Sequence, residues 1–242
     1  MADTQIFNNP QELAAAAADS IVANIKNTLE QQDKFTWVLA GGTAPMLAYK
    51  VLSEKYASES FWKNVNFVLG DERIVPLYDP LSNWYAIHES FLSKLKIDET
   101  NMLAPNYYKS AEDAASDYEA TLRSLPAENS VPKINELWLG MGEDGHTLSL
   151  FPGHDNETYA GALVTAVHYS PKPPPDRISL TLKSLASVKD CKILCSGESK
   201  SEIIAHIING ENSYPIAKVI EVIESNGGKV TWQLDSAAAS LI

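Results

Sequence analysis

Short apolar runs alternate with helix-like segments along this chain, and this alternation limits the fold more than any other feature of the sequence. The runs are brief, rich in β-branched and aromatic residues, and closed by glycine or charge. Four of them are FTWVLAGG, VNFVLGDER, INELWLG and KILCSG. Strands that alternate with helices predict an α/β fold, in which a mainly parallel sheet carries helices on both faces in a Rossmann-like three-layer αβα arrangement.

Helix-start signals support the segments between these runs. Asn9 is a favourable N-cap, Pro10 suits the first turn and Glu12 can reach back, so a helix should run to about Gln31. Ser82 is an N-cap for the helical segment NWYAIHESFLSKL. The spacing of apolar residues also predicts helices at residues 45–56, 110–125 and 198–210, and a half-exposed strand at RISLTL.

Length and composition are those of an ordinary globular protein. The 242 residues fit one α/β domain spanning residues 1–242, long enough to bury a large core. Apolar residues make up 45% and charged residues 21% of the sequence, which is unlike a disordered chain. The sequence leaves open whether the chain is a monomer or a homodimer.

The charge balance argues against nucleic acid and membranes as partners. The chain has 31 acidic and 19 basic residues, and its net charge of -12 repels nucleic acid and anionic lipid. No run of lysine or arginine suggests a local exception. The N-terminus has no basic stretch followed by an apolar core, so we expect neither a secretion signal nor a membrane span.

The two cysteines are expected to be unpaired thiols. Cys191 and Cys195 are four residues apart at the KILCSG strand, which is about 13 Å at the rise of a strand and beyond disulfide reach. We therefore expect reduced, buried thiols and not metal ligands. Reduced thiols of this kind are typical of cytoplasmic proteins.

Polar or glycine-rich clusters follow four of the predicted strands. In a parallel sheet the carboxyl ends of the strands share one edge, and ligands of open α/β folds bind there. Motifs that are distant in the sequence can therefore meet in one site. The four clusters are residues 41–43, 70–73, 140–146 and 196–200.

The stretch GMGEDGHTLSLFPG, residues 140–153, places one histidine among glycines and two acids. His146 titrates near neutrality and can take a proton from water or return one to a leaving oxygen. Asp144 can orient the imidazole ring or favour its charged form. The alternative is a histidine that only hydrogen-bonds the turn. The other histidines have plainer settings, with His88 and His206 in helical patterns, His154 after a turn and His168 at the end of an apolar run.

The first six residues of this stretch also match the G-x-G-x-x-G fingerprint of dinucleotide-binding sites. That fingerprint opens a long helix, whereas Pro152 follows soon after the third glycine. Glu143 and Asp144 would repel a pyrophosphate. These residues argue against a dinucleotide site.

A second theme is anion binding. Arginine is scarce, with only Arg73, Arg123 and Arg177 in the chain, yet two of these flank predicted strands, and planar bidentate donors suit phosphate. Lys200 precedes a helix, where free backbone N–H groups also favour an anion. The sequence Gly41-Gly42-Thr43 offers N–H groups and a hydroxyl at another helix start. Solvated surface charges and a plain tight turn are the alternatives.

Other catalytic chemistries have little support in the sequence. Neither a G-x-S-x-G nucleophile elbow nor an H-E-x-x-H metal motif occurs. Water is therefore the expected nucleophile.

Together these segments resemble the soluble 6-phosphogluconolactonases, which share their fold with the glucosamine-6-phosphate deaminases. The family's L-S-G-G-S-T-P is similar to LAGGTAP here, its G-D-E-R-x-V-P to GDERIVP, and its G-M-G-x-D-G-H-T-x-S-L-F-P-G to residues 140–153. Its proline-rich approach to R-[IV]-[ST]-L-T-L is present as SPKPPPDRISLTL and its G-x-x-K as GESK. The resemblance spans roughly residues 5–235.

The resemblance implies hydrolysis of the δ-lactone of 6-phosphogluconate, the second step of the oxidative pentose phosphate pathway, without metal or organic cofactor. It implies that His146 is the general base and then the acid for the ring oxygen. Asp71 and Asp144 would position this histidine or the sugar hydroxyls. The substrate phosphate would be held by Arg73, Arg177 and Lys200, and the pocket lined by Gly41, Gly42 and Thr43.

The sequence departs from the family pattern at Ala40, at Thr43-Ala44 and at Lys183, where serine, Ser-Thr and proline are common. Thr43 keeps a hydroxyl, so activity is expected to persist. One rival interpretation is a glucosamine-6-phosphate deaminase, whose loop reads D-G-H-[IL]-[AG]-F-N-E-P, whereas DGHTLSLFP stands here. Another rival is a non-catalytic phosphosugar-binding protein on the same scaffold.

Overall fold

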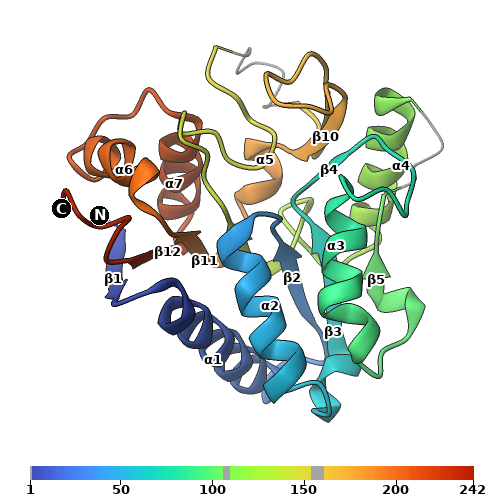
Figure 1. Ribbon diagram of the computed structural model, residues 1–242. Helices are drawn as coiled ribbons and strands as arrows, with labels where there is room; N and C mark the ends of the chain where they lie inside the picture. The colour runs from blue at the N-terminus through green and yellow to red at the C-terminus, as the bar shows by residue number, and fades with distance from the viewer. Residues whose placement is uncertain (1, 106–109, 154–160) are drawn as a thin grey trace.

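Seven parallel strands form the centre of the molecule, in the order β1-β12-β11-β8-β2-β3-β5 (Figure 1). The computed structural model describes residues 2–105, 110–153 and 161–242. All four predicted runs are strands of this sheet. Its strands are β1 Asp3–Phe7, β2 Phe35–Leu39, β3 Val65–Leu69, β5 Met102–Leu103, β8 Ile134–Leu139, β11 Val188–Cys195 and β12 Lys229–Asp235.

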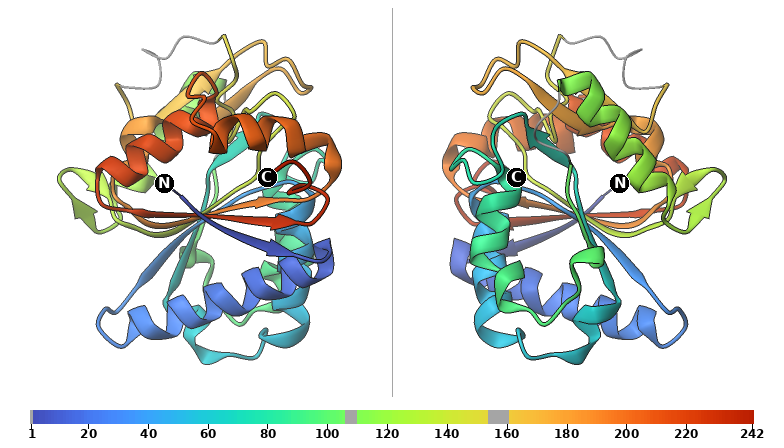
Figure 2. Two further views of the ribbon diagram at one scale, coloured as in Figure 1. Left: turned by 90° about the vertical axis from the view of Figure 1, so that its left-hand side faces the viewer. Right: turned by 90° about the vertical axis from the view of Figure 1, so that its right-hand side faces the viewer.

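Helices cover both faces of the sheet, which confirms the predicted three-layer α/β fold (Figure 2). One face carries α1 Pro10–Leu29, α2 Thr43–Lys55 and α3 Asn83–Ser90. The other carries α4 Ala111–Arg123, α5 Leu182–Leu185, α6 Ser201–Ile208 and α7 Pro215–Ser225. Short 3₁₀ helices occupy Ser60–Asn64, Leu92–Lys94, Glu99–Asn101 and Glu198–Lys200.

The predicted helix caps are present. The side chain of Asn9 accepts a hydrogen bond from the Glu12 N–H at 2.9 Å, and Ser82 Oγ accepts one from the Tyr85 N–H at 3.0 Å. Helix α1 ends at Leu29, two residues before the expected end. Helix α3 stops at Ser90, and only a 3₁₀ turn continues the predicted segment.

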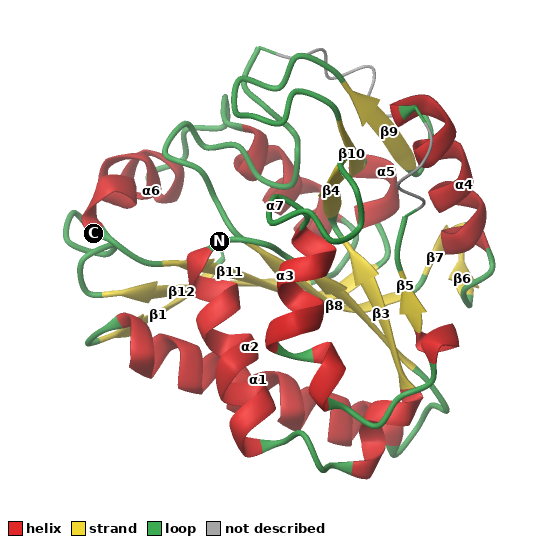
Figure 3. Cartoon of the chain, turned by 45° about the vertical axis from the view of Figure 1, so that its right-hand side comes forward, coloured by secondary structure: helices red, strands yellow, loops and turns green. Residues whose placement is uncertain are grey.

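A second, antiparallel sheet changes the expectation for RISLTL. It consists of β4 Asp71–Arg73, β10 Arg177–Leu180 and β9 Val164–Val167, and it stands above the carboxyl ends of the central strands (Figure 3). The alternation in RISLTL predicted a half-exposed strand, but all four residues of β10 are buried, partly because α4 packs against β9 and β10. The pairing places Arg177 directly opposite Arg73.

Five elements of the central layers were not anticipated: β1, β5, β12, α5 and α7. A small hairpin, β6 Ala127–Glu128 with β7 Val131–Pro132, follows α4. The face of the sheet under α1, α2 and α3 holds a cluster of buried aromatic rings, Trp37, Tyr49, Trp62, Phe67, Phe91 and Trp138.

Cys191 and Cys195 lie on β11 as buried free thiols, as predicted. Burial raises the pKa of the Cys195 thiol to about 11, so it is protonated near neutral pH. In the part of the chain that the structure describes, no helix is long and apolar enough to cross a bilayer. That residues 1–242 form one domain stays a prediction.

Candidate active site

A cavity of about 480 Å³ opens at the carboxyl ends of four neighbouring strands, β11, β8, β2 and β3. The chain leaves β2 toward β3 and leaves β8 toward β11, so the strand order reverses between β2 and β8. Ligands of open α/β sheets bind at such a reversal. Of the predicted site residues, this cavity brings together Gly41, Gly42, Thr43, Asp71, Arg73, His146, Arg177 and Lys200.

His146 stands on the loop after β8, and a carboxylate holds one of its two ring nitrogens. Its Nδ1 lies 2.5 Å from Oδ1 of Asp144, and its side chain is 15% exposed. Nε2 has no hydrogen-bond partner within residues 2–105, 110–153 and 161–242. Burial lowers the pKa of His146 below its ordinary value, although Asp144 favours the charged form. The ring is therefore neutral near pH 7, and Nε2 is its basic atom.

Glycine at position 142 is required by this arrangement. A Cβ atom there would overlap Cε1 and Nδ1 of His146 and also Oδ1 of Asp144. The loop is closed by backbone hydrogen bonds from the Gly142 N–H to the His146 carbonyl at 2.9 Å and from the Gly145 N–H to the Gly142 carbonyl at 3.1 Å. Gly145 has φ +75°, which a side chain rarely tolerates. The glycines thus let the imidazole fold back onto the main chain.

Asp144 and Asp71 occupy different places. Asp144 contacts His146 and does not line the cavity. Partial burial opposes its ionisation, but the hydrogen bond and charge of His146 lower the pKa of Asp144. Asp71 does line the cavity, and its Oδ2 accepts a hydrogen bond from Ser149 Oγ at 2.6 Å. One acid thus orients the ring and the other faces the ligand space.

The buried carboxylate of Glu72 fixes the strand that carries Asp71. It accepts the N–H groups of Arg73, Asn83 and Trp84 at 2.7 to 2.8 Å and the Ser82 hydroxyl at 3.0 Å. Burial raises the pKa of Glu72, and these hydrogen bonds oppose the rise. The contacts join β4 to the start of α3.

Asn83 is a cavity residue that the sequence analysis read only as part of a helix. Its Nδ2 donates to the Asp71 carbonyl at 3.1 Å and lies 3.4 Å from Asp71 Oδ1. Its amide also lies so close to Gly41 that a Cβ atom there would overlap it. Asn83 therefore packs the first loop against Asp71.

Arg177 is 4% exposed, and its guanidinium is wrapped by its own loop. Nη2 donates to the Lys172 carbonyl at 2.8 Å and to the Pro173 carbonyl at 3.4 Å, and Nε donates to the Pro174 carbonyl at 3.2 Å. The guanidinium carbon lies 5.5 Å from the ring centre of Phe151, whose ring also lies 4.7 Å from that of His146. Phe151 thus contacts both the imidazole and the guanidinium.

Cations dominate the charged lining of the cavity. Arg73, Lys172, Arg177 and Lys200 face it together with two acids, Asp71 and Glu143. Arg73 Nη1 donates to the Leu81 carbonyl at 2.6 Å, while its buried Nε has no partner among the described residues. The local charge is therefore positive although the chain carries -12 overall. In the sequence Lys172 stood out only as part of the proline-rich segment SPKPPPDRISLTL.

The first loop presents backbone donors to the same space. Gly42 caps α2 with φ +99° and no side-chain cap, and Gly42, Thr43 and Ala44 line the cavity. The first N–H groups of a helix have no partner within the helix and suit an anion. The geometry fits the expected role of this loop.

The other described histidines lie away from the cavity lining. His168 sits between Asp176 and Glu112, each 2.8 Å from one ring nitrogen, and these carboxylates raise the pKa of His168. His88 and His206 have acidic neighbours on the surface. His154 lies outside the described residues. Within the described ranges no three His, Cys, Asp or Glu side chains are grouped to hold a metal ion.

Comparisons with known proteins find similarity along almost the whole chain. The family model described as glucosamine-6-phosphate isomerases/6-phosphogluconolactonase matches residues 8–232. The 6-phosphogluconolactonase of Bos taurus is 33% identical over 240 residues, which cover 98% of this chain and 92% of that protein.

Solved structures are similar over nearly the whole chain. The 6-phosphogluconolactonase of Thermotoga maritima has a TM-score of 0.83 and 28% identity, covering 97% of this chain and 100% of that one. A monomeric glucosamine-6-phosphate deaminase has a TM-score of 0.81 and 21% identity, covering 99% of this chain and 100% of that one. The second likeness is one of fold alone.

Proposed function

Because this chain belongs to the glucosamine-6-phosphate isomerase/6-phosphogluconolactonase family, we propose that it hydrolyses 6-phospho-D-glucono-1,5-lactone to 6-phosphogluconate. The observation that carries the proposal is Nε2 of His146, which has no partner among the described residues and stands in a cavity lined by four cations. Such a site combines a proton acceptor with an anchor for a phosphate ester.

The reaction needs one group that moves a proton twice. Nε2 of His146 takes a proton from water as the water oxygen bonds to the lactone carbonyl carbon. When the bond from that carbon to the ring oxygen breaks, the imidazolium returns the proton to the leaving oxygen. Asp144 holds the proton on Nδ1 throughout and stabilises the imidazolium. Asp71 faces the sugar hydroxyls as a hydrogen-bond acceptor.

The substrate phosphate lies among Arg73, Lys172, Arg177 and Lys200 in this proposal. Arg177 also organises the loop that carries Lys172, because three carbonyl groups of that loop accept its N–H groups. The unpartnered Nε of Arg73 and the open start of α2 provide further donors.

Hydrolysis is better supported than deamination by the surroundings of His146. The deaminase loop pattern places a glutamate near the histidine, at the position of Phe151 here. The Phe151 ring is buried and packs against the imidazole, so that position supplies no carboxylate. The retained histidine and cations also disfavour a non-catalytic sugar-binding protein.

A coupled assay tests the proposal. Lactone generated in place should disappear faster than by spontaneous hydrolysis, in proportion to added protein, while glucosamine-6-phosphate should release no ammonia. Ammonia release would indicate the deaminase, and absence of both activities with retained 6-phosphogluconate binding would indicate a binding protein. Activity that survives a chelator is expected from the proposed metal-independent chemistry. A cytoplasmic location stays a prediction.

A further inference from the structure

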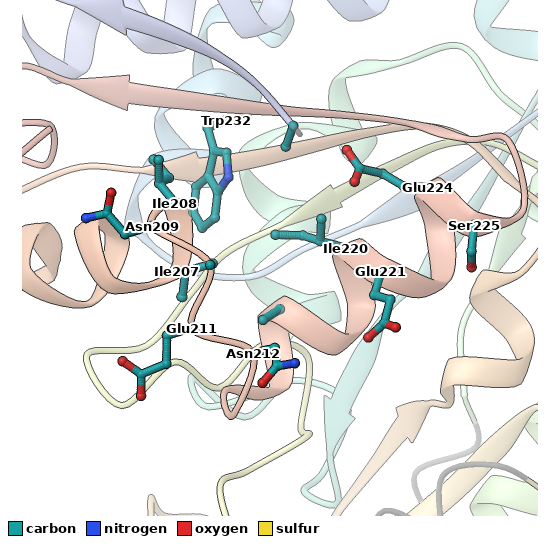
Figure 4. Close-up of a pocket in the computed structure, with 13 residues that line it drawn as sticks. Ile207, Ile208, Asn209, Glu211, Asn212, Ile220, Glu221, Glu224, Ser225 and Trp232 are labelled. Atoms are coloured by element: carbon teal, nitrogen blue, oxygen red, sulfur yellow. The ribbon is translucent and has the colours of Figure 1, made fainter.

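A second cavity, of about 610 Å³, lies between the α6–α7 connection and strand β12, and none of its lining residues lines the candidate active site (Figure 4). Ile207 and Ile208 at the end of α6 face Ile220 of α7 across it, and Ala217 of α7 also lines the cavity. Its volume falls in the range of small-molecule sites, about 300–1,000 Å³. The reaction proposed above uses no part of it.

The inner wall of this cavity carries an unused hydrogen-bond donor. Trp232 of β12 is 1% exposed and lines the cavity. Its Nε1 makes no hydrogen bond with residues in the described ranges, and unlike Trp37 Nε1 it is not sealed from solvent. Figure 4 shows the indole nitrogen turned toward Ile220. A donor that opens into a cavity is available to an acceptor atom of a bound ligand.

The charged residues around the cavity have one sign. Glu211, Glu221 and Glu224 line it, and none of its other lining residues in the described part of the chain is lysine or arginine. Glu211 is already paired with His206 at 3.3 Å, whereas Glu221 forms no ion pair within the described ranges. The cavity therefore combines an apolar wall, an inner N–H donor and an acidic rim.

We propose that this cavity binds a small organic cation. The cation has a flat apolar body, an atom at its inner end that accepts a hydrogen bond from the Trp232 N–H, and an ammonium group that reaches Glu221. The acidic rim disfavours an anionic ligand of the same shape. A second copy of this chain, itself at -12, is disfavoured for the same reason.

Tyramine is a probe with these three features, and 3-(4-hydroxyphenyl)propionate is its anionic counterpart. In the full-length ¹⁵N-labelled protein the five tryptophan indole signals are resolved, and Trp232→Phe identifies the relevant one. Tyramine should move the Trp232 signal with a dissociation constant of about 1 mM or lower. The acid should bind at least about 10-fold more weakly. A Trp232 signal that tyramine leaves in place, or that both probes move equally, overturns the proposal.

Two variants localise the binding. Ala217→Phe fills the cavity and should abolish the shift, while the other four indole signals stay in place and report an intact fold. Glu221→Gln should weaken tyramine about 2-fold to 5-fold, the usual worth of an exposed ion pair. Glu202→Gln on α6, exposed and outside the cavity, is the matched control and should change nothing. Undiminished binding by Ala217→Phe, or equal weakening by the two glutamine variants, overturns the proposed site.

Discussion

Oδ1 of Asp144 lies 2.5 Å from Nδ1 of His146 and 3.2 Å from the backbone nitrogen of the same residue. One carboxylate oxygen therefore fixes both the ring and the main chain of the histidine. Because Nδ1 donates to Asp144, Nε2 is the nitrogen left to accept a proton. The position of the basic atom is thus set by a residue outside the cavity lining.

His146→Ala should lower kcat by about 100-fold or more, because a positioned general base contributes on that scale. KM should change little, since the cations proposed to hold the phosphate are untouched. Steady-state kinetics with corrected spontaneous hydrolysis measure both constants. Full activity in this variant would make His146 a structural residue.

Asp144→Asn tests the positioning role separately. It should lower kcat by about 100-fold, because the amide no longer fixes the Nδ1–H tautomer. It should also shift the acid limb of the pH profile to lower pH, because the Asp144 hydrogen bond and charge raise the pKa of His146. In the wild type this limb should lie below the ordinary histidine range, since burial lowers the pKa of His146. An unmoved limb in Asp144→Asn would contradict the assigned coupling.

Gly142→Ala should displace the imidazole without unfolding the chain. The added Cβ would overlap the His146 ring, and φ at this residue lies outside the positive range, so the backbone itself tolerates alanine. We expect kcat to fall by about 10-fold or more, with an unchanged melting temperature. Gly161→Ala is the control, since no atom of the described residues lies within 4 Å of its added Cβ. Equal kinetics of the two variants would show that the ring position is not critical.

Lys172→Ala and Arg177→Ala should separate binding from loop structure. Both should raise KM by about 10-fold or more, because each removes a cation from the phosphate region. Only Arg177→Ala should also lower the melting temperature, because it leaves three loop carbonyl groups without their donor. Lys94→Ala, which is exposed and outside the cavity, controls for loss of one positive charge. A normal KM in either cavity variant would remove that residue from the phosphate site.

The cavity could be predicted from sequence because its parts follow strands. Glycine and polar clusters end β2, β3, β8 and β11, and a parallel sheet brings such ends to one edge. In the sequence Asn83 stands at a predicted helix start, and Lys172 stands in a proline-rich segment. Neither local pattern indicates which distant residues these side chains contact in the folded protein. The fold brings Asn83 to Asp71, because the buried Glu72 carboxylate accepts the Asn83 backbone N–H and so places the Asn83 side chain beside the Asp71 carbonyl.

The antiparallel sheet shows the same limit on a larger scale. Strand β10 pairs with β4, so Arg177 lies opposite Arg73 although about a hundred residues separate them. The alternation in RISLTL predicts a strand, but it does not show which element covers the strand. The covering helix, α4, comes from a different part of the chain. Strand β1 was missed because its residues are mostly exposed and give no apolar run.

Glu136→Gln should make the protein less sensitive to pH. Glu136 is fully buried on β8 and accepts hydrogen bonds from Asn24 and Trp138, each at 2.6 Å. Burial raises its pKa from 4.5 to about 7. Between these two pH values the folded state therefore still binds a proton that the unfolded state has lost.

The free energy of unfolding of the wild type should therefore fall, relative to the glutamine variant, by about 1–3 kcal/mol as the pH rises from 4.5 to 7. Above pH 7 the difference should level off. Glutamine has only one acceptor oxygen, so one of these two hydrogen bonds is lost in the variant. The stability lost with it is the same at each pH, because the amide does not titrate, and it leaves the pH dependence unchanged. Urea unfolding of both proteins at pH 5 and pH 8 measures it, with the exposed Glu54→Gln as control. A constant difference across this range would mean that Glu136 stays in one protonation state.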